Sequence, residues 1–146
     1  MLQYAALALG AVNAISAIRQ GYAEKEESEY NAGLINYKVG AIEVQKNIEY
    51  AQYERLKART WGTSMANAAS MGIRPTGSAL AVMNTAQKNI MIDQVISKFN
   101  REQEKKYTVE EGRTEIRRGK KAVKAGYTRG LTSILSGAVD YYDRTR

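Results

Sequence analysis

The sequence predicts an all-α protein: a long antiparallel helical hairpin with apolar helical ends, elongated and oligomeric. The chain of 146 residues contains one proline and is rich in Ala, Glu, Lys, Gln and Arg, which favour helix over sheet. Glycine and this proline gather near the middle of the chain, where they break the helical pattern. Apolar residues before this break recur at alternating steps of four and three, the period of a coiled coil.

The length fits a single helical domain, residues 1–146. Within it the composition changes four times along the chain. The expected segments are an apolar N-terminal segment, a first long helix, a tip loop, a second long helix, and an apolar and basic C-terminal segment; these cover residues 1–21, 23–70, 71–78, 79–125 and 126–146.

The first eighteen residues carry no charged side chain. Basic residues do not precede this apolar run, and its first cation, Arg19, follows it, which argues against a secretory signal. Gln3, Asn13 and Ser16 interrupt the run, which is also short for a membrane-spanning helix. We therefore expect a retained apolar end that packs against a partner or enters a membrane, through Leu7, Leu9, Val12 and Ile15.

The first long helix carries the clearest apolar stripe, which we predict to be a seam between copies of the chain. A second stripe, formed by Ile35, Val39 and Ile42, widens the apolar face. Because two stripes on one helix require more than one neighbour, they favour a homo-oligomer. The predicted oligomer seam consists of Leu34, Tyr37, Ala41, Val44, Ile48 and Ala51.

Beyond Arg55 the stripe continues in small residues, among them Ala58 and Gly62, so we expect the two helices to approach most closely towards the tip. The tip itself holds Gly72, Pro75 and Gly77, and the hydroxyl of Ser78 is expected to cap the second helix.

The second helix turns strongly polar after Phe99, and we expect it to break near Gly112 or Gly119. Gly112, Gly119 and Gly126 fall seven residues apart. The pairs Gly33 and Gly40, and Gly130 and Gly137, have the same spacing, which puts each set on one helix face where a neighbouring backbone can come close. The C-terminal segment regains apolar character at Leu131, Ile134 and Leu135. A hairpin brings these two apolar ends together, and we expect them to pack on each other.

The sequence contains no cysteine and no histidine, so thiol chemistry, Ser-His-Asp sets and the commonest metal ligands are absent. The tip lacks the order of a phosphate-binding loop. Glu24, Glu26, Glu27 and Glu29 lie together early in the first helix, where the helix dipole and solvation account for them. We expect no enzymatic activity and no cofactor.

A basic cluster in the second half is the best candidate for a specific contact within this chain of net charge +7. Four of its cations are spaced by four, three and four residues and therefore line one helix face: Arg113, Arg117, Lys120 and Lys124. Such a row fits DNA phosphates without sequence preference, an acidic groove on a partner protein, anionic lipid headgroups, or simply solvent. The candidate polyanion- or partner-binding residues are Arg113, Arg117, Arg118, Lys120, Lys121, Lys124 and Arg129.

The arrangement resembles the small internal virion proteins of short-tailed bacteriophages, the core or ejection proteins that leave the capsid with the DNA. The resemblance is carried by the apolar N-terminus, the long Gln/Glu/Arg helix, the tip AASMGIRPTGSALAVM, a central Asp93 in IMIDQVISKFN, and a Gly-rich apolar end. Its sharpest part runs from Ala68 to Val82. The basic segment 113–129 departs from the family's pattern.

This resemblance implies a structural protein that assembles in multiple copies near the portal, inside the capsid. It implies ejection into the host envelope to help form a genome-delivery conduit, in contact with the portal, larger core proteins, genomic DNA and the envelope membrane. One alternative is a helical-hairpin assembly subunit, such as a tail, portal-adaptor or secretion-needle component, without a membrane role. Another is a nucleic-acid- or membrane-binding module that acts alone.

Overall fold

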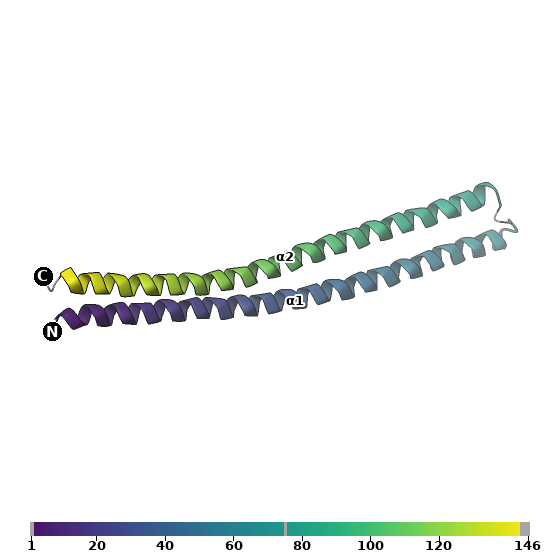
Figure 1. The fold of residues 1–146 in the computed structure, drawn as a ribbon. Coiled ribbons are helices and arrows are strands. Elements are labelled where there is room, and N and C mark those ends of the chain that lie inside the picture. The colour runs from purple at the N-terminus through teal and green to yellow at the C-terminus, as the bar shows by residue number, and fades with distance from the viewer. Residues whose placement is uncertain (1, 75, 144–146) are drawn as a thin grey trace. The chain divides into compact units, whose positions relative to one another are not determined.

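A computed structural model describes residues 2–74 and 76–143, and the side chains of residues 8–74, 76–139, 141 and 142. Helix α1 spans Leu2–Ser70 and helix α2 spans Ser78–Asp143, and they pack against each other (Figure 1). The described residues contain no strand. The prediction of an all-α protein built on two long helices is therefore confirmed.

The helices form two compact units. The terminal unit comprises Met1–Tyr37 of α1 with Val109–Arg146 of α2, and the tip unit comprises Lys38–Thr108. The terminal unit holds both chain ends, and the tip unit holds the turn.

Helix α1 ends in the hydrogen-bonding pattern of a Schellman motif. The N–H of Ile73 donates to the carbonyl of Ala68 at 2.9 Å, and the N–H of Gly72 donates to Ala69 at 3.0 Å. Gly72 has φ +67°, in the left-handed region that glycine adopts without a steric penalty. The glycine at this position therefore ends α1 and satisfies two of its last carbonyls.

The start of α2 corrects one sequence expectation. The N–H of Ala81 donates to the carbonyl of Gly77 at 3.1 Å, so Gly77 accepts the first helical hydrogen bond and occupies the cap position. Ser78 is already the first helical residue, so its predicted capping role was wrong by one position. Gly77 takes this place because the chain enters the helix at φ +58°. Pro75 lies outside the described residues.

In the terminal unit, glycines bring the two helix backbones together. A Cβ placed on Gly126 would lie 2.7 Å from the carbonyl oxygen of Ala17, and one on Gly119 would lie 3.0 Å from Cβ of Ser28. A Cβ on Gly112 would lie 3.1 Å from Ile35. The predicted close approach of a neighbouring backbone is confirmed at Gly119 and Gly126, whereas at Gly112 the nearest atoms belong to the side chain of Ile35.

Gly33 and Gly40 do not take part in such an approach, because a Cβ on either would meet nothing within 4 Å. The expected breaks near Gly112 and Gly119 are also not present, since α2 continues through both. Glycine weakens an exposed helix by about 1 kcal/mol relative to alanine. At Gly112 and Gly119, burial against α1 offsets that cost.

The tip unit does not show the close approach of small residues that the sequence suggested. Ala58 is exposed, and a Cβ on Gly62 would meet nothing within 4 Å. These residues lie on the flank of α1, whereas the half-buried positions of α1 at this level are Lys57, Thr60, Ser64 and Ala68. The expectation was wrong because it followed the more apolar stripe, which is not the one that α2 covers.

Candidate assembly surfaces

Helix α1 carries two apolar stripes, and α2 covers only one of them. Ile35 and Ile42 are buried at 6% and 9% exposure. Leu34, Tyr37 and Val44 of the predicted oligomer seam are 48%, 81% and 59% exposed. The other members of this exposed α1 stripe are also open: Ala41, Ile48 and Ala51.

Helical geometry explains this division. Successive residues turn by about 100° around a helix, so Leu34 and Tyr37 point roughly 100° and 200° away from Ile35, on the outer flank of α1. The same offset relates Ala41 and Val44 to Ile42. The exposed stripe therefore cannot reach α2 within this chain, and it remains available to another molecule.

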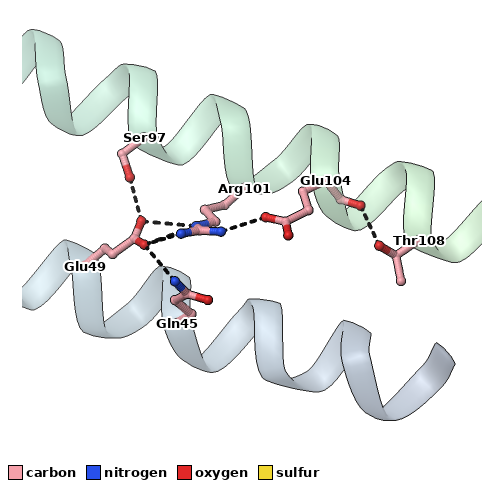
Figure 2. Close-up of polar contacts among 6 residues, drawn as sticks. All are labelled: Gln45, Glu49, Ser97, Arg101, Glu104 and Thr108. Carbon is pink, nitrogen blue, oxygen red and sulfur yellow. Dashed lines mark hydrogen bonds and ion pairs between the residues drawn. The ribbon is translucent and has the colours of Figure 1, made fainter. Parts of the chain in front are cut away.

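Hydrogen bonds and an ion pair join the two helices of the tip unit around Glu49 and Arg101 (Figure 2). The carboxylate of Glu49 accepts hydrogen bonds from Nη2 of Arg101 at 2.6 Å and from Oγ of Ser97 at 2.7 Å. The same guanidinium donates to Glu104 at 2.7 Å within α2. Glu49 and Arg101 are only 23% and 25% exposed. Arg101 and Ser97 together lower the pKa of Glu49 to about 2.

A second polar cluster lies further along the same contact. Nζ of Lys46 donates to Glu43 at 2.7 Å and to Glu102 at 2.8 Å, and Lys105 also donates to Glu43. Hydrogen bonds from Lys105 and Lys46 lower the pKa of Glu43 to about 2. The pKa of Lys46 is raised by Glu102 and Glu43.

Towards the turn a third set continues the polar contact. Glu54 accepts hydrogen bonds from Lys57 at 2.8 Å and from Nε2 of Gln94 at 3.0 Å, and these lower the pKa of Glu54. Gln87 donates to the carbonyl of Lys57 at 2.9 Å.

Sequence reasoning did not identify these three polar sets. A signal was present, because Lys46, Glu49 and Tyr53 extend the inner stripe of Val39 and Ile42 at steps of four, three and four. Opposite charges recur on α2 at Arg101, Glu102 and Lys105. The pattern of charge, rather than of apolar residues, marks the inner face here.

The outer side of α2 in the tip unit carries an exposed apolar patch. A shallow groove of about 400 Å³ is lined by Lys88, Met91, Ile92, Val95 and Ile96. Val95 and Phe99 are 66% and 59% exposed. The tip unit thus has many polar side chains between its helices, beside the buried Ile42 and Met83, and exposed apolar side chains on their outer flanks.

The predicted basic residues all lie in the terminal unit and are all exposed. Arg113 pairs with Glu110, and Arg118 lies 3.8 Å from Glu115, each within α2. The second carboxylate oxygen of Glu115 is buried and has no hydrogen-bond partner among the described residues. Of the predicted basic residues, five form no ion pair within the described part of the chain: Arg117, Lys120, Lys121, Lys124 and Arg129.

At the chain ends, small residues form the contact and large apolar residues face outward. A Cβ on Gly10 would lie 2.9 Å from the carbonyl oxygen of Ser133, and Ala14 is 3% exposed. The predicted apolar contact residues are instead between 49% and 66% exposed: Leu9, Val12, Ile15, Leu131, Ile134 and Leu135. The side chain of Leu7 lies outside the described residues.

Over the described residues, no helix has a stretch long and apolar enough to cross a membrane. The same residues contain no group of three or more His, Cys, Asp or Glu side chains placed to hold a metal ion. Comparison with known proteins finds no matching family model, no matching curated protein and no matching solved structure.

Proposed function

We propose that this protein is a non-enzymatic assembly subunit, an internal virion protein of a short-tailed bacteriophage. It acts in multiple copies near the portal, inside the capsid. After ejection it helps to form the conduit that delivers the genome across the host envelope. Its partners are further copies of itself, the portal, larger core proteins, genomic DNA and the envelope membrane.

The observation that supports this proposal best is the exposed apolar surface on both helices. Large apolar side chains on the outer flanks of both helices are well exposed: Tyr37 and Val44 of α1 are 81% and 59% exposed, and Val95 and Phe99 of α2 are 66% and 59% exposed. Water contact with apolar surface is unfavourable, so burial of these side chains against neighbouring molecules would stabilise an assembly. The exposed α1 stripe supplies an ordered apolar surface for such contacts.

The polar contact in the tip unit supports the same proposal. Lys46, Glu49 and Arg101 hold α1 and α2 together through ion pairs, so the apolar flanks are not needed for pairing within the chain. Salt bridges also reject mispaired helices more strongly than apolar contacts do. A subunit of this kind keeps its own two-helix pairing while its flanks bind neighbours.

The test is the mass of the purified protein by light scattering, with and without liposomes of anionic lipid. We expect a discrete oligomer whose formation or size changes on contact with lipid. A variant with Leu34→Lys, Val44→Lys and Ile48→Lys should remain helical and lose the oligomer. The matched control, Asn36→Lys, Asn47→Lys and Gln52→Lys, adds the same charge at exposed polar positions and should assemble like the unchanged protein.

A monomer that ignores lipid would refute the assembly proposal. An oligomer of unchanged mass that ignores lipid would contradict the conduit and favour an assembly subunit without a membrane role.

A further inference from the structure

Two bands of opposite charge lie side by side in the terminal unit, at the same position along the axes of the paired helices. We call this position along the axes their height. The acidic band of α1 consists of Glu24, Glu26, Glu27 and Glu29, and all four are exposed. The basic band of α2 consists of Arg117, Arg118, Lys120 and Lys121, and all four are exposed. The height is set by Gly119, whose Cβ would lie 3.0 Å from Ser28 and 3.3 Å from Cα of Lys25.

The two bands do not neutralise each other within the chain. Glu29 pairs with Lys25 at 3.4 Å, and Glu24 accepts a hydrogen bond from Gln20 at 3.2 Å, both within α1. Arg118 approaches Glu115 within α2. Among the described residues no ion pair joins the acidic band to the basic band. Both bands therefore present charge to the outside.

The acidic band runs directly into the exposed α1 stripe. Glu27, Tyr30, Leu34 and Tyr37 follow steps of three, four and three, so they share one flank of α1. Tyr30 and Leu34 are 67% and 48% exposed. A neighbour that covers these two apolar side chains lies next to Glu27, so cations on it at the same height would complement the acidic band.

We propose that a second copy of this chain is that neighbour, parallel to the first and level with it, and that its basic band binds the acidic band. This inference rests on the self-association proposed above and names the surfaces that carry it. A level, parallel copy places α2 of one molecule beside α1 of the next, so opposite charges meet without any sliding of one copy along the other. Each molecule then has one acidic and one basic band to offer, and the contact can repeat around a ring.

The exposure of the charged groups indicates what the charged bands and the apolar stripe each contribute to the contact. Ion pairs between exposed side chains add little affinity each, whereas like charges placed together oppose association. The apolar stripe therefore supplies most of the contact, and the two bands set the orientation and height of the neighbouring copy.

The first experiment is a charge swap, measured by sedimentation velocity. One variant changes the four glutamates of the acidic band to lysine, and the other changes the four cations of the basic band to glutamate. Each alone should weaken association at least about tenfold, and an equal mixture of the two should restore it. Far-UV circular dichroism checks that both variants stay helical.

The variant with a reversed basic band also controls for net charge. Four reversals change the charge of the chain by eight, from +7 to −1, so general repulsion between molecules decreases. Weaker association in this variant would therefore support a specific contact, and association equal to or stronger than that of the unchanged protein would overturn the inference.

The second experiment uses disulfide cross-linking, because the chain has no cysteine of its own. A Glu27→Cys chain and a Lys121→Cys chain are mixed and oxidised, and mass spectrometry separates the products. We expect the mixed disulfide to exceed either symmetric one, since Glu27 and Lys121 lie on facing bands. Predominance of the Glu27→Cys symmetric product would place α1 against α1 and overturn the inference.

The outcomes separate this inference from the proposed function. If the unchanged protein never associates, both fail. If it associates and both charge variants associate equally well, only the inference fails. If the variant with a reversed basic band associates normally but no longer binds random-sequence duplex DNA, the basic band serves DNA, and the inference again fails alone.

Discussion

At the scale of single residues, glycine decides how closely the helices of the terminal unit approach. Gly112, Gly119 and Gly126 lie seven residues apart on α2, and a side chain at any of them would press on α1. At Gly126 the nearest atom is a backbone carbonyl oxygen, which cannot move aside as the end of a flexible side chain can. The absence of a Cβ is therefore a packing requirement at this position.

This requirement predicts that two alanine substitutions change the free energy of unfolding in opposite directions. Gly126→Ala should lower the free energy of unfolding by about 1–3 kcal/mol, because the new Cβ would lie 2.7 Å from the oxygen of Ala17. Gly33→Ala, whose Cβ would meet nothing within 4 Å, should raise it by up to about 1 kcal/mol through helix propensity. Urea unfolding followed by circular dichroism measures both, and equal effects of the two substitutions would refute the packing argument.

At the scale of helices and their contacts, the tip unit depends on ionised carboxylates. Hydrogen bonds from Arg101 and Ser97 lower the pKa of Glu49 from 4.5 to about 2, and those from Lys105 and Lys46 do the same for Glu43. A carboxyl with a lowered pKa stabilises the folded chain fully above its unfolded value and loses this contribution as the pH falls through its folded value. Stability should therefore decrease as the pH falls from about 4.5 to about 2.

The corresponding prediction compares two Glu→Gln variants of the same cluster. Glu49→Gln removes the charge partner of Arg101 across the two helices, so it should lower Tm at pH 7 and flatten the decrease of Tm in acid. Glu104→Gln removes an ion pair within α2 whose carboxylate is 48% exposed, and it should change Tm much less. Thermal melts from pH 7 to pH 2 measure Tm of both variants. Identical dependence of Tm on pH in the two variants would contradict a cross-helix role for Glu49.

At the scale of the whole molecule, the proposed assembly couples folding to concentration. Because only the folded chain presents the exposed α1 stripe, association stabilises the folded state by mass action. We therefore predict that Tm of the unchanged protein rises with protein concentration, while Tm of the variant with Leu34→Lys, Val44→Lys and Ile48→Lys does not. A Tm independent of concentration in both proteins would exclude self-association of the folded chain over the range tested.

Much of the fold could be predicted from local sequence patterns. Composition and the coiled-coil period predict two long helices, and Gly72 and Gly77 mark where the chain turns. The seven-residue spacing of Gly112, Gly119 and Gly126 predicts a close backbone approach, which the structure confirms at Gly119 and Gly126. Each of these properties depends on residues close together in the sequence, so a single chain reveals them.

Which stripe of α1 faces α2 could not be predicted in this way. Leu34, Tyr37 and Val44 form the more regular apolar stripe, yet α2 covers Ile35 and Ile42. The choice depends on the free energy of two complete faces in contact, including Gly112 against Ile35 and Arg101 against Glu49. These partners lie far apart in the sequence, and no local pattern reports how well they fit.

The sequence by itself therefore determined the helices, their turn and the positions of charge and apolar residues, because helical periodicity and backbone preference are local. Only the tertiary structure decided which apolar residues remain exposed and that Glu24, Glu26, Glu27 and Glu29 lie level with the basic band. Those properties arise from the pairing of α1 with α2, whose register is set by contacts between distant residues such as Gly119 and Ser28.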